Sequence, residues 1–256
     1  MSSHGVHAGC IEDVWQIAIE IASRAGGDRG CPGLYGPPRP PAAVKPQRLV
    51  VLETEGWPEI DVATRSAFES IIGWLRQADI DILRRGDDPA IEALERAIGD
   101  ARRIGNAITA WENRWSIRNL VDQFPEGVSR RAKASLAASE AMTPDDYREL
   151  LVQRAIAQQR HAAIGPIADA AILLSCPGPA PLWPGDVAGQ PLEPRPTGDS
   201  VFNMPTSMLF APALTMPLMS VAGMPVGAQL MGQQHEDARI AALARWLIEQ
   251  VSPVLS

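Results

Sequence analysis

The sequence predicts an α/β fold in which a mixed β-sheet is flanked by helices. Three observations lead to this prediction. Short apolar runs at 48–53 and 169–175 are bounded by turn-forming residues, as buried strands are. Long segments between these runs repeat their apolar residues at helical spacing. Near the C-terminus, the apolar runs 213–219 and 225–231 are separated by a turn that contains Gly223, which suits two adjacent strands.

The N-terminal part reads as a helix followed by a strand–helix–strand unit. Apolar residues that follow Ile11 fall at helical spacing and predict the first helix. Residues 30–46 are rich in proline and glycine and predict a loop. The run 48–53, a helix over 61–78 and a weaker strand over 80–83 then form a βαβ crossover. Such a crossover implies neighbouring parallel strands with a right-handed connection.

The middle of the chain is predicted to be helical, and its end to combine strands with a final helix. Residues 89–120 and 130–141 carry no strand signal and predict two or three partly exposed helices. The segment 143–163 opens with a hydroxyl N-cap, a proline at the first helical position and acidic residues, so it predicts another helix. A second proline-rich loop covers 176–196, and the last helix begins at about Glu236.

Composition bounds the class of protein. The chain has 256 residues, of which 46% are hydrophobic and 21% charged, as in an ordinary globular protein, and we expect one domain over 1–256. A net charge of -7 disfavours binding to nucleic acid or to anionic lipid. No run approaches the ~20 apolar residues of a membrane span. Three scattered cysteines and the lack of a signal-peptide pattern predict reduced thiols and a cytoplasmic location.

Several motif-bearing enzyme classes are disfavoured. The sequence has no G-x-S-x-G elbow, no Walker loop, no G-x-G-x-x-G after a strand and no H-E-x-x-H. His4 and His7 are three residues apart, but a zinc site needs three or four ligands. We therefore expect neither a metal nor a cofactor.

Three C-terminal motifs, in this order, resemble the C-terminal part of the amidase signature family. They are Thr197-Gly-Asp-Ser-Val-Phe-Asn-Met-Pro205 with its continuation to Met219, Gly223-Met-Pro-Val-Gly-Ala-Gln-Leu-Met-Gly232, and His235-Glu-Asp-Ala-Arg239. Upstream segments are also similar to the family: His4–Asp13, Thr143–Tyr147 and Asp169–Leu174. The resemblance covers nearly all of the chain and is weakest between Pro89 and Ala141.

The resemblance implies an activity and, at the same time, missing catalytic groups. Members of the family hydrolyse amides with a serine, a bridging serine in a cis peptide and a neutral lysine. None of that region is recognised here, and neither Lys45 nor Lys133 matches the family lysine. We assign no catalytic residue and expect the chain to be inactive alone. Two alternatives stay open: a non-catalytic binding or interaction module, and a relative of the amidase subunit of a tRNA-dependent amidotransferase.

The resemblance also implies a substrate class, a site and partners. The substrate would be a small-molecule amide, and Asp199, Phe202 and Asn203 would line its pocket. Alternatively, Asp199 or Ser200 only caps the short helix that follows. A sheet without its family neighbours should expose edges and apolar faces. We therefore expect aggregation or a partner, either a homo-oligomer or an N-terminal half supplied in trans.

Overall fold

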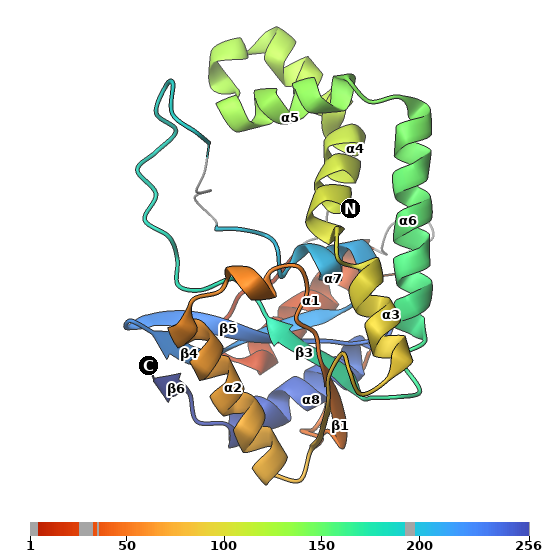
Figure 1. The fold of residues 1–256 in the computed structure, drawn as a ribbon, viewed down its shortest axis with the longest axis vertical. Helices are drawn as coiled ribbons and strands as arrows, with labels where there is room; N and C mark the ends of the chain where they lie inside the picture. The colour runs from red at the N-terminus through yellow and green to blue at the C-terminus, as the bar shows by residue number, and fades with distance from the viewer. Residues whose placement is uncertain (1–4, 26–32, 35, 193–197, 256) are drawn as a thin grey trace.

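The structure is a computed structural model that describes residues 5–25, 33–34, 36–192 and 198–255. Figure 1 shows a twisted sheet in the lower half of the molecule with helices on both of its faces. The predicted α/β class is therefore confirmed. Both proline-rich loops lie partly outside the described residues, as do His4 and Thr197 of the motifs.

Six strands form one mixed sheet in the order β2-β1-β3-β5-β4-β6. The central β3 pairs in parallel with β1 and antiparallel with β5. β1 is also parallel to β2, and β4 is antiparallel to β5 and parallel to β6. Their bounds are β1 Arg48–Val51, β2 Asp81–Leu83, β3 Ala170–Leu174, β4 Ala213–Val221, β5 Met224–Met231 and β6 Val254–Leu255. The five predicted strands are confirmed, and β6 was not predicted.

Eight α-helices are found among the described residues, and each predicted helical segment contains at least one of them. Their bounds are α1 Ile11–Ala25, α2 Val62–Gln77, α3 Pro89–Ala97, α4 Ala101–Gln123, α5 Arg130–Glu140, α6 Pro144–Ala162, α7 Met204–Leu209 and α8 Asp237–Gln250. Local signals set several starts. Asp61 caps α2 by accepting from Thr64 N at 2.6 Å, and Thr143 and Asp146 form a reciprocal capping box at α6. No described helix is long and apolar enough to cross a membrane.

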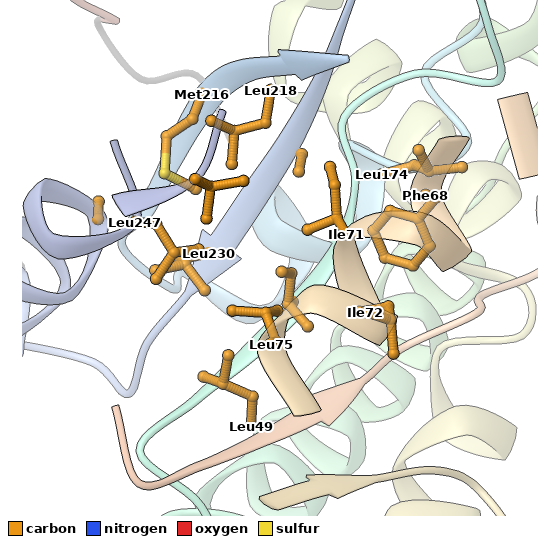
Figure 2. Close-up of a cluster of buried hydrophobic side chains, with 14 of the residues drawn as sticks. Leu49, Phe68, Ile71, Ile72, Leu75, Leu174, Met216, Leu218, Leu230 and Leu247 are labelled. Carbon is orange, nitrogen blue, oxygen red and sulfur yellow. The ribbon is translucent and has the colours of Figure 1, made fainter. Parts of the chain in front are cut away.

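Each face of the sheet has its own hydrophobic core because successive strand residues point to opposite faces. On β3, Ile172 and Leu174 pack in the cluster covered by α1, α2 and α8. Their neighbours Ala171 and Leu173 pack in the cluster covered by α3, α4 and α6. Figure 2 shows the first cluster, where Leu49, Ile71, Leu75 and Leu230 meet between the sheet and α2. This double burial explains the unbroken apolar runs.

The expectation that the sheet exposes apolar faces is wrong for its central strands. All five residues of β3 are buried, as are Leu49, Val50 and Val51 of β1. The helices that the chain itself supplies cover both faces, so a sheet of six strands closes its own core. Exposed apolar side chains gather elsewhere, on elements that rise from this body.

The hairpin between β4 and β5 turns within two residues. Val221 pairs with Met224, and the two residues between them, Ala222 and Gly223, have φ angles of 51° and 75°. Positive φ at both positions is typical of the type I′ turn, whose twist matches that of the flanking strands. Gly223 adopts this conformation without strain, whereas the Cβ of Ala222 makes it unfavourable.

The far end of α4, the whole of α5 and the proline-rich segment project away from the sheet (Figure 1). α4 is buried only near its start, at Ala101, Ile104, Gly105 and Ile108. Residues 177–192, which we call the arm, leave β3 and run up to α5 without regular structure. Arg130 and Arg131 hold the arm there. The Arg131 guanidinium lies 3.1 Å from Asp186, and Arg130 donates to the carbonyl oxygens of Val187 and Gln190.

Candidate substrate-binding loop

The predicted site residues lie on the loop 198–203, just before α7. This loop is fastened beside the ends of β1 and β3. These two strands are parallel, so the segments that follow them, 52–56 and 175–178, emerge at the same edge of the sheet. In open α/β sheets, ligands bind outside this carboxyl edge. The sequence therefore brings loop 198–203 to a place where such folds build their sites.

The side chain of Gln229 on β5 links the loop to the sheet through hydrogen bonds. This side chain is buried, 2% exposed, and lies opposite Leu173 in the strand register. The amide nitrogen donates to the carbonyl oxygen of Leu174 at 3.0 Å and to that of Phe202 at 3.1 Å. One side chain therefore joins the end of the central strand to the loop. Gln229 belongs to the quoted glycine–glutamine motif, but its role was not predicted.

Phe202 anchors the loop in the hydrophobic core. Its side chain is fully buried, and it belongs to the cluster under α2 and α8. Gly56 packs directly against it: a Cβ on this glycine would stand 2.8 Å from the Phe202 ring and 2.7 Å from Val201. The segment after β1 and the loop therefore meet without a side chain between them. The buried ring fixes the height of the loop above the sheet.

Asp199 joins a charged network that no sequence signal indicated. Its carboxylate accepts from its own loop at Val201 N and lies 2.9 Å from the Arg102 guanidinium. Arg102, in the first turn of α4, also pairs with Glu59 at 3.1 Å. The Arg102 backbone N–H donates to Glu55 at 2.8 Å. One arginine thus connects the loop to the segment after β1, and three carboxylates surround it.

The electrostatics of this network favour a charged, hydrogen-bonded arginine. Burial alone lowers the pKa of the Arg102 guanidinium. The hydrogen bond and charge of Glu59 and the charge of Asp199 outweigh that effect and raise the pKa above its ordinary value. Arg102 therefore stays protonated and holds Asp199 in one orientation. The two other carboxylates leave the network with negative charge in excess.

Asn203 is exposed and occupies the N-cap position of α7, where its side chain makes no capping hydrogen bond. The alternative in which Asp199 or Ser200 caps this helix is therefore wrong. Ser200 instead contributes its carbonyl oxygen, which accepts from Asn203 N and Met204 N. The Ser200 hydroxyl is buried and has no hydrogen-bond partner among the described residues. Asp199 and Asn203 thus present polar groups at the loop surface, while Phe202 lies beneath them.

A buried carboxylate supports the segment that follows β1. Glu95 on α3 is only 4% exposed and accepts from Glu53 N at 2.7 Å and from Thr54 N at 3.1 Å. Burial raises the pKa of Glu95, and the two hydrogen bonds oppose that rise. Thr54 has a left-handed φ of 59°, which these bonds help to hold. The sequence signal for this role is the spacing of Glu95, which follows Ile91 by four residues and therefore lies on the same, buried face of the helix.

The site offers no metal-binding group within the described part of the chain, where no three histidine, cysteine, aspartate or glutamate side chains cluster suitably.

Comparisons with known proteins give a match in fold only. Neither protein-family models nor curated proteins match the sequence. A solved amidase matches with a TM-score of 0.67 and 23% identity, over 83% of this chain and 48% of its own. A chain of an inhibitor-bound vestigial complex, connected with the origins of an s-triazine catabolic enzyme, gives 0.71 and 18%, over 96% and 53%.

A bacterial aryl acylamidase of the amidase signature family also matches, with a TM-score of 0.55 and 13% identity, over 82% of this chain and 44% of its own. The chain therefore spans about half the length of these solved structures. The TM-scores establish a shared fold, and at identities this low they establish no shared activity. The fold of this chain is that of the amidase signature enzymes, over about half of their length.

Proposed function

We propose that this chain is the C-terminal, substrate-binding part of an amidase that hydrolyses a carbon–nitrogen bond in a small-molecule amide. The observation that carries the proposal is the fastening of loop 198–203 at the carboxyl edge of the sheet by Gln229 and Arg102. Asp199 and Asn203 present an acceptor and an amide group on that loop. Both suit recognition of a neutral amide, and the shared fold supports the same reaction class.

The catalytic groups, in this proposal, come from a polypeptide segment outside these 256 residues. The family mechanism needs a lysine, and the chain has only Lys45 and Lys133. Lys45 is exposed and precedes β1, at the edge of the sheet opposite to loop 198–203. Lys133 lies on the projecting α5. Neither position favours proton transfer to a substrate held by Asp199 and Asn203.

A reconstitution experiment tests this proposal. The probe is the part of the solved amidase that has no counterpart in this chain, produced as a separate polypeptide. We expect aliphatic and aryl amides to be hydrolysed by the mixture and by neither component alone. Asp199→Ala should raise the KM of the mixture, whereas the matched variant Asp13→Ala, at an exposed position of α1, should not.

Two results would contradict the proposal. One is turnover by the purified chain alone, either dependent on Lys45 and Lys133 or persisting when both are replaced by alanine. The other is a mixture that shows no turnover at all. Saturable binding of an amide without turnover in any mixture would favour the non-catalytic binding module.

A further inference from the structure

The elements that rise from the sheet form one surface with unusual composition. We call it the projecting surface, and it comprises residues 111–124 at the end of α4, the helix α5 and the arm 177–192. Six large hydrophobic side chains are exposed on it: Trp115, Leu120, Phe124, Leu182, Trp183 and Val187. Leu182 is 93% exposed, Trp115 72% and Phe124 63%. A stable monomer rarely gathers so many apolar side chains on one protrusion, and such patches mark protein contacts.

The arm contains no helix or strand, but contacts with α5 hold it in a defined position on the projecting surface. The ion pair between Arg131 and Asp186 is only partly exposed, at 23% and 22% of the two side chains. Two further hydrogen bonds from Arg130 fix the arm backbone. A preformed surface loses less entropy when a partner binds. The exposed arm therefore suits docking better than a segment with no attachments.

Two shallow depressions accompany the exposed side chains. One, of about 280 Å³, lies between the arm and α5 and is lined by Arg131, Trp183, Val187 and Pro191 among others. The second, of about 190 Å³, lies between α4 and α5, where the Arg114 guanidinium stacks 3.7 Å above the Trp111 ring. Tryptophan and arginine beside a depression are the residue types that dominate protein interfaces.

The arm also connects this surface to the candidate substrate-binding loop. At its base, Gly178 packs against the N-terminus of α2, so that a Cβ there would stand 3.2 Å from the Thr64 hydroxyl. Pro181 lies beside Gly198, the first described residue of the loop. The first residues of the arm therefore lie beside the candidate site. A polypeptide docked along it would reach the space above Asp199.

We propose that the projecting surface docks the polypeptide segment that carries the catalytic groups. This inference rests on the proposed function and identifies the contact surface for its missing part. The solved structures that share this fold have about half of their residues without a counterpart here. The projecting surface carries uncovered apolar side chains, and the arm joins it to the candidate site, so a polypeptide docked there would reach the loop.

Binding measurements with the amidase-derived probe test the inference. Calorimetry with the intact chain should give a saturable interaction, and Leu182→Asp and Phe124→Asp should each weaken it about tenfold or more. Both side chains are exposed, so neither substitution should disturb folding. The matched control is Leu255→Asp on β6, a leucine that is 80% exposed. Its dissociation constant should equal that of the unchanged chain.

The outcomes separate the inference from the proposed function. Equal binding by all variants, with turnover in the mixture, would overturn the docking surface and keep the amidase proposal. Binding that depends on Leu182 and Phe124 without any turnover would support the docking surface and contradict the amidase proposal. Absence of binding would contradict the inference. A dimer of the chain alone, seen by light scattering and abolished by Leu182→Asp, would assign the surface to a second copy and also overturn it.

Discussion

The side-chain amide of Gln229 donates to the carbonyl oxygen of Phe202 at 3.1 Å, across the boundary between the sheet and the candidate loop. Replacing Gln229 by leucine leaves that buried oxygen without its donor. Since an unpaired buried polar group costs about 1–3 kcal/mol, we expect the free energy of unfolding to fall by about 2 kcal/mol. Urea denaturation measures this loss. Gln16→Leu, on an exposed position of α1, should change it by less than about 0.5 kcal/mol.

Arg102 should control the mobility of the loop more than global stability. Arg102→Ala removes the partner of Asp199 and leaves three carboxylates close together. Because these groups are partly exposed, we expect a loss of only about 1 kcal/mol, decreasing with added salt. Amide hydrogen exchange at Val201 should become faster. The neighbouring Arg103→Ala, which removes an exposed pair with Asp100, should leave that exchange unchanged; equal acceleration in both would argue against the network.

Stability should fall as the pH drops from about 6.5 to 4 because of His161. Burial of this side chain on α6 lowers its pKa to about 4, against 6.5 in an unfolded chain. The unfolded state therefore binds more protons in this range, and acid favours unfolding by about 3 kcal/mol at pH 4. Glu95, whose pKa is raised, contributes in the opposite sense.

The difference between the unchanged chain and His161→Gln isolates this effect. Denaturant titrations at several pH values should show a smaller acid loss in that variant. His235→Gln, at an exposed residue, should keep the full loss. If the pH dependence of His161→Gln matched that of the unchanged chain, another group would be responsible.

The turn between β4 and β5 offers a stabilising substitution. Ala222 has a φ of 51°, in the left-handed region where its Cβ is disfavoured. Ala222→Gly relieves that strain and should raise the free energy of unfolding by about 0.5–1 kcal/mol. The melting temperature by circular dichroism should increase accordingly. Ala213→Gly, at an extended position of β4, should lower it instead, since glycine there only adds flexibility to the unfolded chain.

The spacing of apolar residues, together with turn-forming and capping residues, predicted most of the fold for a clear physical reason. Buried parallel strands need unbroken apolar runs, and helices need a repeated apolar face, so both leave local patterns. β6 was missed because two residues carry no pattern. The boundary between α3 and α4 was not located, although Gly99 follows the C-cap residue Ile98 and Asp100 is the N-cap of α4. Glycine and aspartate are common at helix ends, but one of each within a long helical composition does not by itself divide it.

The candidate site was less predictable because its contacts join distant parts of the chain. The resemblance indicated Asp199, Phe202 and Asn203, and whether they contact a substrate stays a prediction. Nothing local to Arg102 indicates a partner 97 residues away. Gln229 stood inside a recognised motif, yet its two carbonyl partners depend on the register of β3 against β5. Long-range pairing of this kind is a property of the folded topology.

The parallel pairing of β1 with β3 has a consequence for how the chain folds. Leu49 lies beside Ala170, so this pairing must close a loop of about 120 residues, whereas β4 and β5 close across two. Distant pairing is slow, and the hairpin should form first. Until β1 arrives, the apolar edge of β3 is available to other chains. Refolding yield should therefore decrease as protein concentration rises, even though the native sheet conceals that edge completely.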